Sequence, residues 1–259
     1  MNSTEKKMQE KYPWDRNKFH SSYNNILAHY QAISCLENSS GESLLDLACG
    51  DGTMTKMFSE KFKRIVGVDA SGTHLSKAKE RLPSVEFHES LIEDFATSEK
   101  FDSVFLLMVL EHVQDPIELI KVASSFLKEN GTLIIHVPNA NAINRKIAVK
   151  MGTLKTCDEL SPFDIDIAGH RRSYTLETLS EDVKKAGLKV KSTGGIFYKM
   201  LSTPQIDWFL KNGEWNSGHG WGRTGVENVD WEAEFCRACY EIGKERPEDC
   251  NVIYVCVTK

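Results

Sequence analysis

The chain has 259 residues, of which 41% are hydrophobic, and a formal net charge of −5. The hydrophobic fraction supports a packed core, and the acidic balance argues against a main partner that is a nucleic-acid backbone. No apolar run approaches the roughly 18 residues that cross a membrane, and the polar first residues do not read as a secretory signal. Seven cysteines, an odd number, favour free thiols in a cytoplasmic protein.

The first part of the chain predicts one long amphipathic helix. From Trp14 to about Leu36, apolar residues recur at helical spacing. The segment Ser39-Ser40-Gly41 then breaks the chain before the first strand. We therefore expect residues 1–40 to form a helical cap over the mouth of the core, although a helix packed on a sheet would show the same pattern.

The stretch from Leu44 to Gly52 predicts a buried strand followed by a glycine turn. Leu44, Leu45 and Leu47 are apolar, as in a strand covered on both faces of a parallel sheet. Gly50 and Gly52 then allow a sharp bend and a close approach by a ligand, and a helical pattern follows. Such a corner favours a nucleotide-like ligand, but the third glycine of the dinucleotide fingerprint is missing.

Strand and helix patterns alternate through the rest of the chain. This alternation predicts an α/β fold with a parallel sheet and right-handed crossovers. Irregular segments at about 139–172 and 197–230 read as insertions within a domain that spans 41–259. The expected strands are 44–48, 64–69, 85–88, 102–108, 132–137, 188–196 and 252–257, and the expected helices are 53–61, 73–82, 116–127, 175–186 and 231–243.

Two motifs resemble those of the class I S-adenosylmethionine-dependent methyltransferases. The first is Asp46-x-Ala48-x-Gly50-x-Gly52, in which Ala48 replaces the usual first glycine. The second, Leu110-Glu111-His112-Val113, is similar to a tetrad of the ubiquinone-biosynthesis type of small-molecule methyltransferase. The resemblance covers roughly residues 41–140. It implies a Rossmann-like methyltransferase fold, a doubly wound sheet of seven mostly parallel strands with the last strand antiparallel.

The resemblance also implies a cofactor, S-adenosyl-L-methionine, which would leave as S-adenosyl-L-homocysteine. Asp69 ends a strand about 20 residues after the turn, the spacing of a carboxylate that accepts ribose hydroxyls. The remaining positions follow from the motifs: Asp46 and Gly50 for the amino group, Ala48 and Gly52 in the turn, Ala70 under the adenine, Leu91 and Ile92 at the adenine edge, Met108 and Val109 beside the methionine part, and Arg16 and Tyr23 from the cap.

Candidate catalytic residues lie at the exit of the first insertion. His170 is a potential general base, and Arg171 and Arg172 could clamp an anionic group. The alternative is a turn whose arginines pair with nearby acids. His112 is a further candidate, for which a role in orienting the helix entry is the competing interpretation. His136 and Asn139 are weaker candidates, because a histidine within an apolar strand is usually a core residue.

We expect no metal site. The pair Cys236-x-x-Cys239 resembles half a zinc site, but no second pair or histidine has matching spacing. Amphipathic aromatics in the second insertion indicate either a lid over a polar ligand or a dimer interface. These residues are Trp208, Trp215 and Trp221, together with His219 and Arg223.

The sequence therefore predicts an O-methyltransferase for a small polar, anionic acceptor. The His-Arg-Arg segment and Gly243–Cys250 are similar to segments of methyltransferases from bacterial surface-polysaccharide pathways. This resemblance implies that the methyl acceptor is a sugar or phosphate-bearing precursor. The alternatives are a nitrogen or phenol acceptor, a protein or RNA acceptor, and a non-catalytic cofactor-binding protein. We expect a monomer or homodimer without membrane or nucleic-acid partners.

Overall fold

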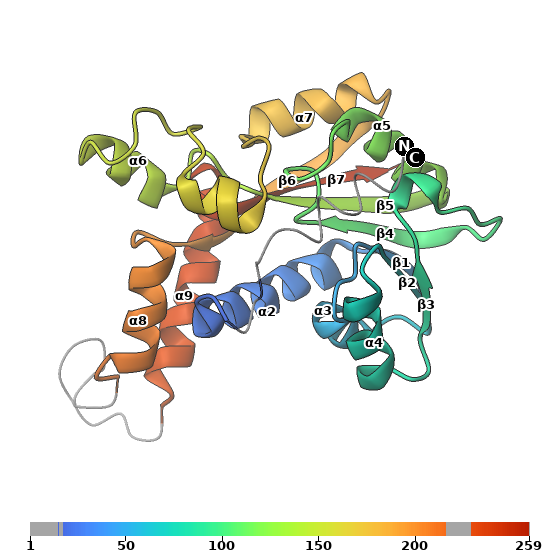
Figure 1. Ribbon diagram of the computed structural model, residues 1–259, viewed down its shortest axis with the longest axis horizontal. Helices are drawn as coiled ribbons and strands as arrows, with labels where there is room; N and C mark the ends of the chain where they lie inside the picture. The colour runs from blue at the N-terminus through green and yellow to red at the C-terminus, as the bar shows by residue number, and fades with distance from the viewer. Residues whose placement is uncertain (1–14, 16–17, 216–228, 259) are drawn as a thin grey trace.

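The chain folds around one seven-stranded sheet (Figure 1). The computed structural model describes Asp15, residues 18–215 and residues 229–258. The strand order is β3-β2-β1-β4-β5-β7-β6, and β7 runs antiparallel to both of its neighbours. The predicted doubly wound, mostly parallel sheet is thus confirmed. The strands are β1 Ser43–Leu47, β2 Arg64–Asp69, β3 Glu86–Glu89, β4 Phe101–Leu107, β5 Leu127–Pro138, β6 Lys189–Tyr198 and β7 Cys250–Thr258.

Helices cover both faces of the sheet. In Figure 1, α5 and α7 lie above the sheet, and α2, α3, α4 and α9 lie below it. Leu119, Leu179 and their neighbours form a core under α5 and α7, while Tyr23 and Phe58 belong to two clusters on the other side. The helices are α2 Ser21–Asn38, α3 Thr53–Phe58, α4 Gly72–Arg81, α5 Pro116–Ser125, α6 Ile143–Lys150, α7 Leu176–Lys185, α8 Thr203–Asn212 and α9 Trp231–Glu245.

Helix α2 packs along the lower side of the sheet. Its Tyr30 ring stacks on Tyr240 of α9 with centroids 4.7 Å apart, and Tyr23 meets Phe197 of β6 edge-on at 5.7 Å. Within the described residues, no helix is long and apolar enough to cross a membrane.

The predicted elements differ from the observed ones mainly at their ends and in the insertions. Strand β4 stops at Leu107 because Met108 has a left-handed backbone, and α3 stops at Phe58. The first insertion contains α6 and a single π-helical turn, Phe163–Ala168, and the second contains α8. The expected helix that starts near Thr175 is present, and Thr175 and Thr178 form a reciprocal capping box at its start.

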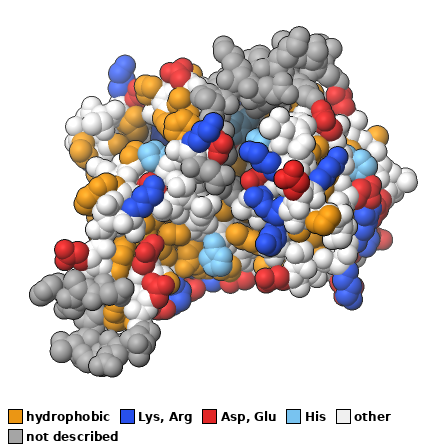
Figure 2. Space-filling model, turned by 60° about the horizontal axis from the view of Figure 1, so that its bottom comes forward, with side chains coloured by type: hydrophobic (Ala, Val, Ile, Leu, Met, Phe, Trp, Pro, Cys, Tyr) orange, Lys and Arg blue, Asp and Glu red, His pale blue; other side chains and the backbone are white. Residues whose placement is uncertain are grey.

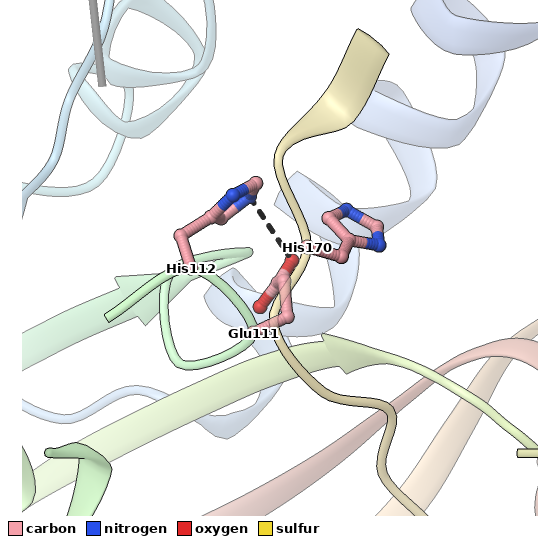
Figure 3. Close-up of side chains that lie close together, drawn as sticks. All are labelled: Glu111, His112 and His170. Atoms are coloured by element: carbon pink, nitrogen blue, oxygen red, sulfur yellow. Dashed lines mark ion pairs between the residues drawn. The ribbon is translucent and has the colours of Figure 1, made fainter. Parts of the chain in front are cut away.

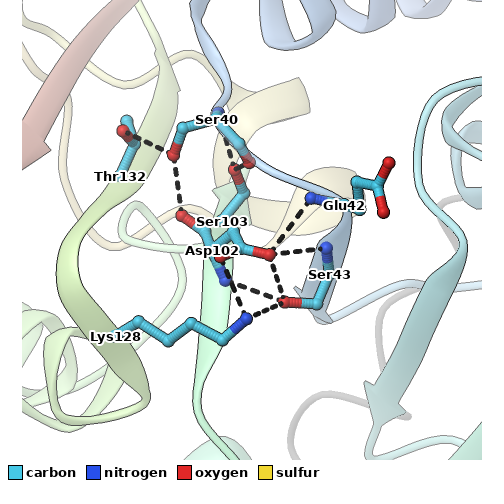
Figure 4. A network of polar contacts seen from close by, with 7 residues as sticks. All are labelled: Ser40, Glu42, Ser43, Asp102, Ser103, Lys128 and Thr132. Atoms are coloured by element: carbon cyan, nitrogen blue, oxygen red, sulfur yellow. Dashed lines mark hydrogen bonds and ion pairs between the residues drawn. The ribbon is translucent and has the colours of Figure 1, made fainter.

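A polar network fixes the amino ends of the central strands (Figure 4). The Asp102 carboxylate accepts hydrogen bonds from the Ser43 hydroxyl at 2.7 Å, the Ser43 amide at 3.0 Å and the Glu42 amide at 3.1 Å. Partial burial raises the pKa of Asp102, but bonds from Ser43 and Lys128 outweigh it and lower the pKa to about 2. A Cβ at Gly41 would lie 2.2 Å from Asp102 Cγ, so the chain needs glycine there.

Candidate active site

The carboxyl ends of β1, β2 and β4 meet where the strand order reverses, the usual ligand position in such sheets. The turn after β1 places Ala48, Gly50 and Gly52 at φ of 60°, 58° and 73°. This alternation of left-handed residues explains why small residues recur in the motif. A Cβ built on Gly50 meets no atom within 4 Å, so the outer side of the turn is open to a ligand.

Asp69 lies beside this turn, as predicted. Its Oδ2 accepts a hydrogen bond from the Gly50 amide at 2.9 Å, and its Oδ1 accepts one from the Ser71 amide at 2.8 Å. Each carboxylate oxygen has two lone pairs, so both can still accept a hydroxyl. The carboxylate is therefore oriented and partly exposed next to the open turn, an arrangement that fits two ribose hydroxyls. Ala70 follows directly and is partly buried.

Asp46 lies deeper in the same site. The side chain is 3% exposed, and its Oδ2 accepts a hydrogen bond from the Thr55 hydroxyl of α3 at 2.7 Å. Burial raises the pKa of Asp46 to about 7. A cationic amino group bound here would favour the ionised carboxylate, so the residues present fit the amino acid end of the cofactor.

The residues predicted for the methionine part lie at the end of β4. Met108 has φ of 59° and donates its amide to the His136 carbonyl at 2.9 Å, while Val109 is buried in the core. Met108 and the buried Tyr23 belong to one cluster. Arg16, also predicted to face the cofactor, lies outside the described residues.

The residues predicted for the adenine edge form a short 3-10 turn. Ile92 is buried in the core, and Leu91 is partly buried. The Leu91 carbonyl accepts the Asp94 amide at 3.2 Å and the Phe95 amide at 3.1 Å. That carbonyl is therefore engaged within the turn, and the Leu91 and Ile92 contact with adenine stays a prediction.

His112 and His170 are brought together from segments far apart in the sequence (Figure 3). Their ring centroids lie 4.9 Å apart. Glu111, which sequence reasoning did not assign a role, lies beside them, with Oε1 3.8 Å from His112 Nε2. Burial, then the nearby His170, lowers the pKa of His112 to about 4, and burial also lowers that of His170. Burial raises the pKa of Glu111 to about 8.

Arg172 has a different arrangement from the anion clamp that the sequence indicated. Its guanidinium donates to the backbone carbonyls of Leu110, Val113 and Gln114, with 2.7 Å to Leu110 and 3.1 Å to Gln114. The Arg171 amide donates to the Glu111 carbonyl at 2.8 Å. The exit of the first insertion is thus fastened to the turn after β4, and Arg172 positions that turn.

A polar pocket adjoins His170. Arg145 reaches into the surrounding insertion, where its Nε donates to the Cys157 carbonyl at 2.7 Å and its Nη1 lies 3.5 Å from Asp164 Oδ2. The lining includes the polar residues Asn139, Arg145, Asp164, His170, Arg172 and Ser173.

Lys199 is a second residue that sequence reasoning missed. It follows β6, is 3% exposed, and its Nζ donates to the Thr203 hydroxyl at 2.8 Å while lying 4.6 Å from the Tyr23 ring centroid. Burial, more than the nearby Arg145, lowers the pKa of Lys199 to about 7. Nothing in its sequence context marks it, because the surrounding residues are apolar strand and helix-start residues.

Most of the weaker candidates make contacts that serve the packing of the fold. The buried His136 lies 3.7 Å from Cys35 Sγ through Nε2, and the Asn139 side chain donates to backbone carbonyls of Glu248 and Cys250. Cys236 and Cys239 are buried free thiols on α9. Trp208 is exposed and Trp215 packs on Phe209, whereas the predicted lid residues His219, Trp221 and Arg223 lie outside the described residues.

The fold is that of a class I S-adenosylmethionine-dependent methyltransferase, with S-adenosylmethionine as its cofactor. A family model described as "Methyltransferase domain" matches residues 22–193, and the chain belongs to this family.

Among curated relatives, the chain is similar to ubiquinone biosynthesis O-methyltransferases. That of Acinetobacter baylyi is 24% identical over 179 residues, covering 64% of this chain and 74% of the relative. That of Pseudomonas syringae pv. tomato is 30% identical over 171 residues, covering 64% and 72%. The match to that of Rhodopseudomonas palustris strain TIE-1 is 27% identical over 115 residues, covering 43% of this chain and 44% of the relative.

Solved structures share the fold at low identity. The plantazolicin methyltransferase BamL, in complex with a triazolic desmethylPZN analog and SAH, has a TM-score of 0.59 at 15% identity and covers 99% of this chain and 96% of its own. An S-adenosylmethionine-dependent methyltransferase from Clostridium acetobutylicum has a TM-score of 0.52 at 17% identity and covers 90% of each chain.

Proposed function

We propose that this methyltransferase transfers the methyl group to a hydroxyl oxygen of a small polar, anionic acceptor. The observation that carries the proposal is the His112–His170 pair, whose rings lie 4.9 Å apart. His112 is in the turn after β4, where its amide donates to the carbonyl of Val109, a residue predicted for the methionine part of the cofactor. Transfer to a hydroxyl requires a group that activates the oxygen, and histidine is suited to this near neutral pH. The curated relatives named as O-methyltransferases support the same choice of atom.

The chain's own residues divide the work as follows. Asp46 and Asp69 hold the two ends of the cofactor, and the open turn at Gly50 admits it. His170 acts on the acceptor hydroxyl, and His112 orients that site. Because the sulfonium carries an activated methyl group, the remaining task is to align the oxygen in line with the S–CH3 bond and exclude water.

The polar pocket beside His170 supports the nature of the acceptor. Arg145 and Arg172 contribute two positive charges to its lining and Asp164 one negative charge, so the fixed charges favour an anion. Both guanidinium groups already donate within the protein, Arg172 to the carbonyls after β4 and Arg145 to the Cys157 carbonyl, so they would attract an acidic group by their positive charge. A sugar or phosphate-bearing precursor, as in surface-polysaccharide synthesis, has the hydroxyl and the negative charge that the residues around this pocket favour.

Other features support a small acceptor and a cytoplasmic setting. On the face that Figure 2 shows, Lys and Arg side chains are interspersed with Asp and Glu, unlike the continuous basic track of a nucleic-acid groove. All seven cysteines are free, as expected of a reducing compartment.

Calorimetric titration with S-adenosylmethionine, S-adenosylhomocysteine and NAD tests the cofactor, and we expect binding of the first two only. The protein is then supplied with methyl-labelled cofactor and a panel of phosphorylated sugars, uronic acids, phenols and amines. Label in an ether of an anionic sugar supports the proposal, whereas label only on amines refutes the choice of oxygen. His170→Ala should abolish turnover at unchanged cofactor affinity. His88→Ala, at a half-buried histidine on β3, should leave turnover unchanged.

A further inference from the structure

Three groups that commonly bind metals converge in the described part of the chain. One ligand atom each from Glu111, His112 and His170 lies within 4.8 Å of the other two. Glu111 and His112 come from the turn after β4, and His170 from the exit of the first insertion (Figure 3). The Arg171 amide and the Arg172 guanidinium fasten that exit to the turn, so the two backbone segments that carry these side chains are held side by side.

Glu111 is the group that most needs a partner. It is 1% exposed, and neither carboxylate oxygen has a hydrogen-bond partner among the described residues. A buried carboxyl group without a partner is costly, and native structures nearly always supply one. Figure 3 shows its carboxylate directed into the space between the two imidazoles.

The outer contacts of the histidines match those of metal ligands. His112 Nδ1 lies 3.3 Å from the Gly169 carbonyl oxygen, which favours a proton on Nδ1 and leaves Nε2 free on the side of Glu111. His170 Nδ1 lies 3.7 Å from Asp164 Oδ1, so a carboxylate stands behind this ring too. Metal-binding histidines commonly direct their second nitrogen to a carbonyl or carboxylate in this way.

We propose that Glu111, His112 and His170 bind one divalent transition-metal ion, with the acceptor oxygen as a further ligand. Two imidazoles and one carboxylate suit Zn²⁺ and Mn²⁺ better than Mg²⁺, which prefers oxygen ligands. Zinc lies about 2.0–2.2 Å from such ligands, so the three atoms would need to close by roughly 1 Å, which side-chain rotation provides. The site is not expected from the sequence, where only the Cys236-x-x-Cys239 pair suggests a metal, because Glu111 and His170 are 59 positions apart.

The catalytic consequence rests on the proposed O-methyl transfer, whereas metal binding itself does not. A metal-bound hydroxyl loses its proton more readily, and the proton goes to solvent. The oxygen lone pair then forms the bond to the methyl carbon, the S–CH3 bond breaks, and its electron pair stays on sulfur to give uncharged S-adenosylhomocysteine. His170 then acts on the hydroxyl by holding the metal.

The test begins with the full chain stripped of metal by a chelator and titrated with Zn²⁺, Mn²⁺ and Mg²⁺ in separate calorimetric runs. We expect one Zn²⁺ or Mn²⁺ per chain, bound at least tenfold more tightly than Mg²⁺. Glu111→Gln and His170→Gln should each weaken binding at least tenfold, and His88→Gln should leave it unchanged. Circular dichroism and Tm establish which variants fold. If Glu111→Gln does not fold, His170→Gln alone serves as the test.

Cobalt absorption separates this site from the cysteines. Co²⁺ should give visible bands without a thiolate charge-transfer band, and both variants should remove the visible bands. The proposal is overturned if the wild-type chain binds none of the metals. It is also overturned if both variants bind the metal as tightly as the wild-type chain does. Metal binding without transfer to any hydroxyl would reject the proposed O-methylation and retain the metal site, and transfer that continues unchanged in the metal-free chain would reject the role of the metal.

Discussion

The Gly50 amide donates a hydrogen bond to the Asp69 carboxylate at 2.9 Å, which joins the end of β1 to the end of β2. The same carboxylate accepts the Ser71 amide at the start of α4. One side chain therefore sets the relative position of the turn and the neighbouring strand while remaining able to accept two more hydroxyl groups.

Replacing Asp69 with Asn should weaken S-adenosylmethionine binding by about 10- to 100-fold, since each hydrogen bond to a charged group contributes about 1.5–3 kcal/mol. Calorimetric titration measures the affinity, and thermal unfolding reports the loss of the turn contacts. Glu60→Gln, at an exposed acid after α3, is the matched control. Wild-type affinity in a folded Asp69→Asn chain would remove Asp69 from the cofactor site.

Replacing Ala48 with Gly should raise the free energy of unfolding by up to about 1 kcal/mol. Ala48 is exposed and has φ of 60°, a region in which a Cβ costs about 1–2 kcal/mol, partly offset by the greater freedom of glycine in the unfolded chain. Urea titration gives the value. Ala96→Gly, at an exposed alanine without positive φ, should instead lower stability, and the same loss at Ala48 would contradict the strain argument.

Replacing Arg172 with Met should lower the free energy of unfolding by about 1–3 kcal/mol, because three backbone carbonyls lose their charged donor. If Arg172 positions the turn, turnover number falls more than the apparent acceptor affinity. A loss confined to KM would instead favour the anion clamp that the sequence indicated. Arg237→Met, at an exposed arginine on α9, controls for removal of a positive charge.

Replacing Lys199 with Met should remove part of the pH dependence of stability. The pKa of Lys199 is about 7 in the folded chain, below its usual value of 10.5. Between these two pH values the unfolded chain therefore carries a proton on Lys199 that the folded chain lacks. The wild-type chain should therefore gain about 1.4 kcal/mol per pH unit relative to Lys199→Met from pH 7 upward, and no relative gain below pH 6. Urea titrations at pH 6, 7, 8 and 9 measure this. Parallel curves for the two chains would show that Lys199 stays charged.

The sequence predicts the sheet well because its strands are short apolar runs with clear breaks. The same reasoning locates the turn at Gly50 and the acid at Asp69, since both lie within a few residues of a strand end. It fails where a side chain's partner is distant in the chain. The partners of Arg172 are carbonyls about 60 positions away, which no residue pattern records, and Glu111 shows its unpartnered state only once the core surrounds it.

The antiparallel strand β7 has a consequence for synthesis on the ribosome. In the sheet, β6 has β7 as its single neighbour, and β7 also pairs with β5. The five parallel strands can assemble while the chain is still being made, but β6 has no strand to pair with until Cys250–Thr258 has been translated. A nascent chain paused before that point would expose the edges of β5 and β6, and such unpaired edges are where chaperones act and aggregation begins.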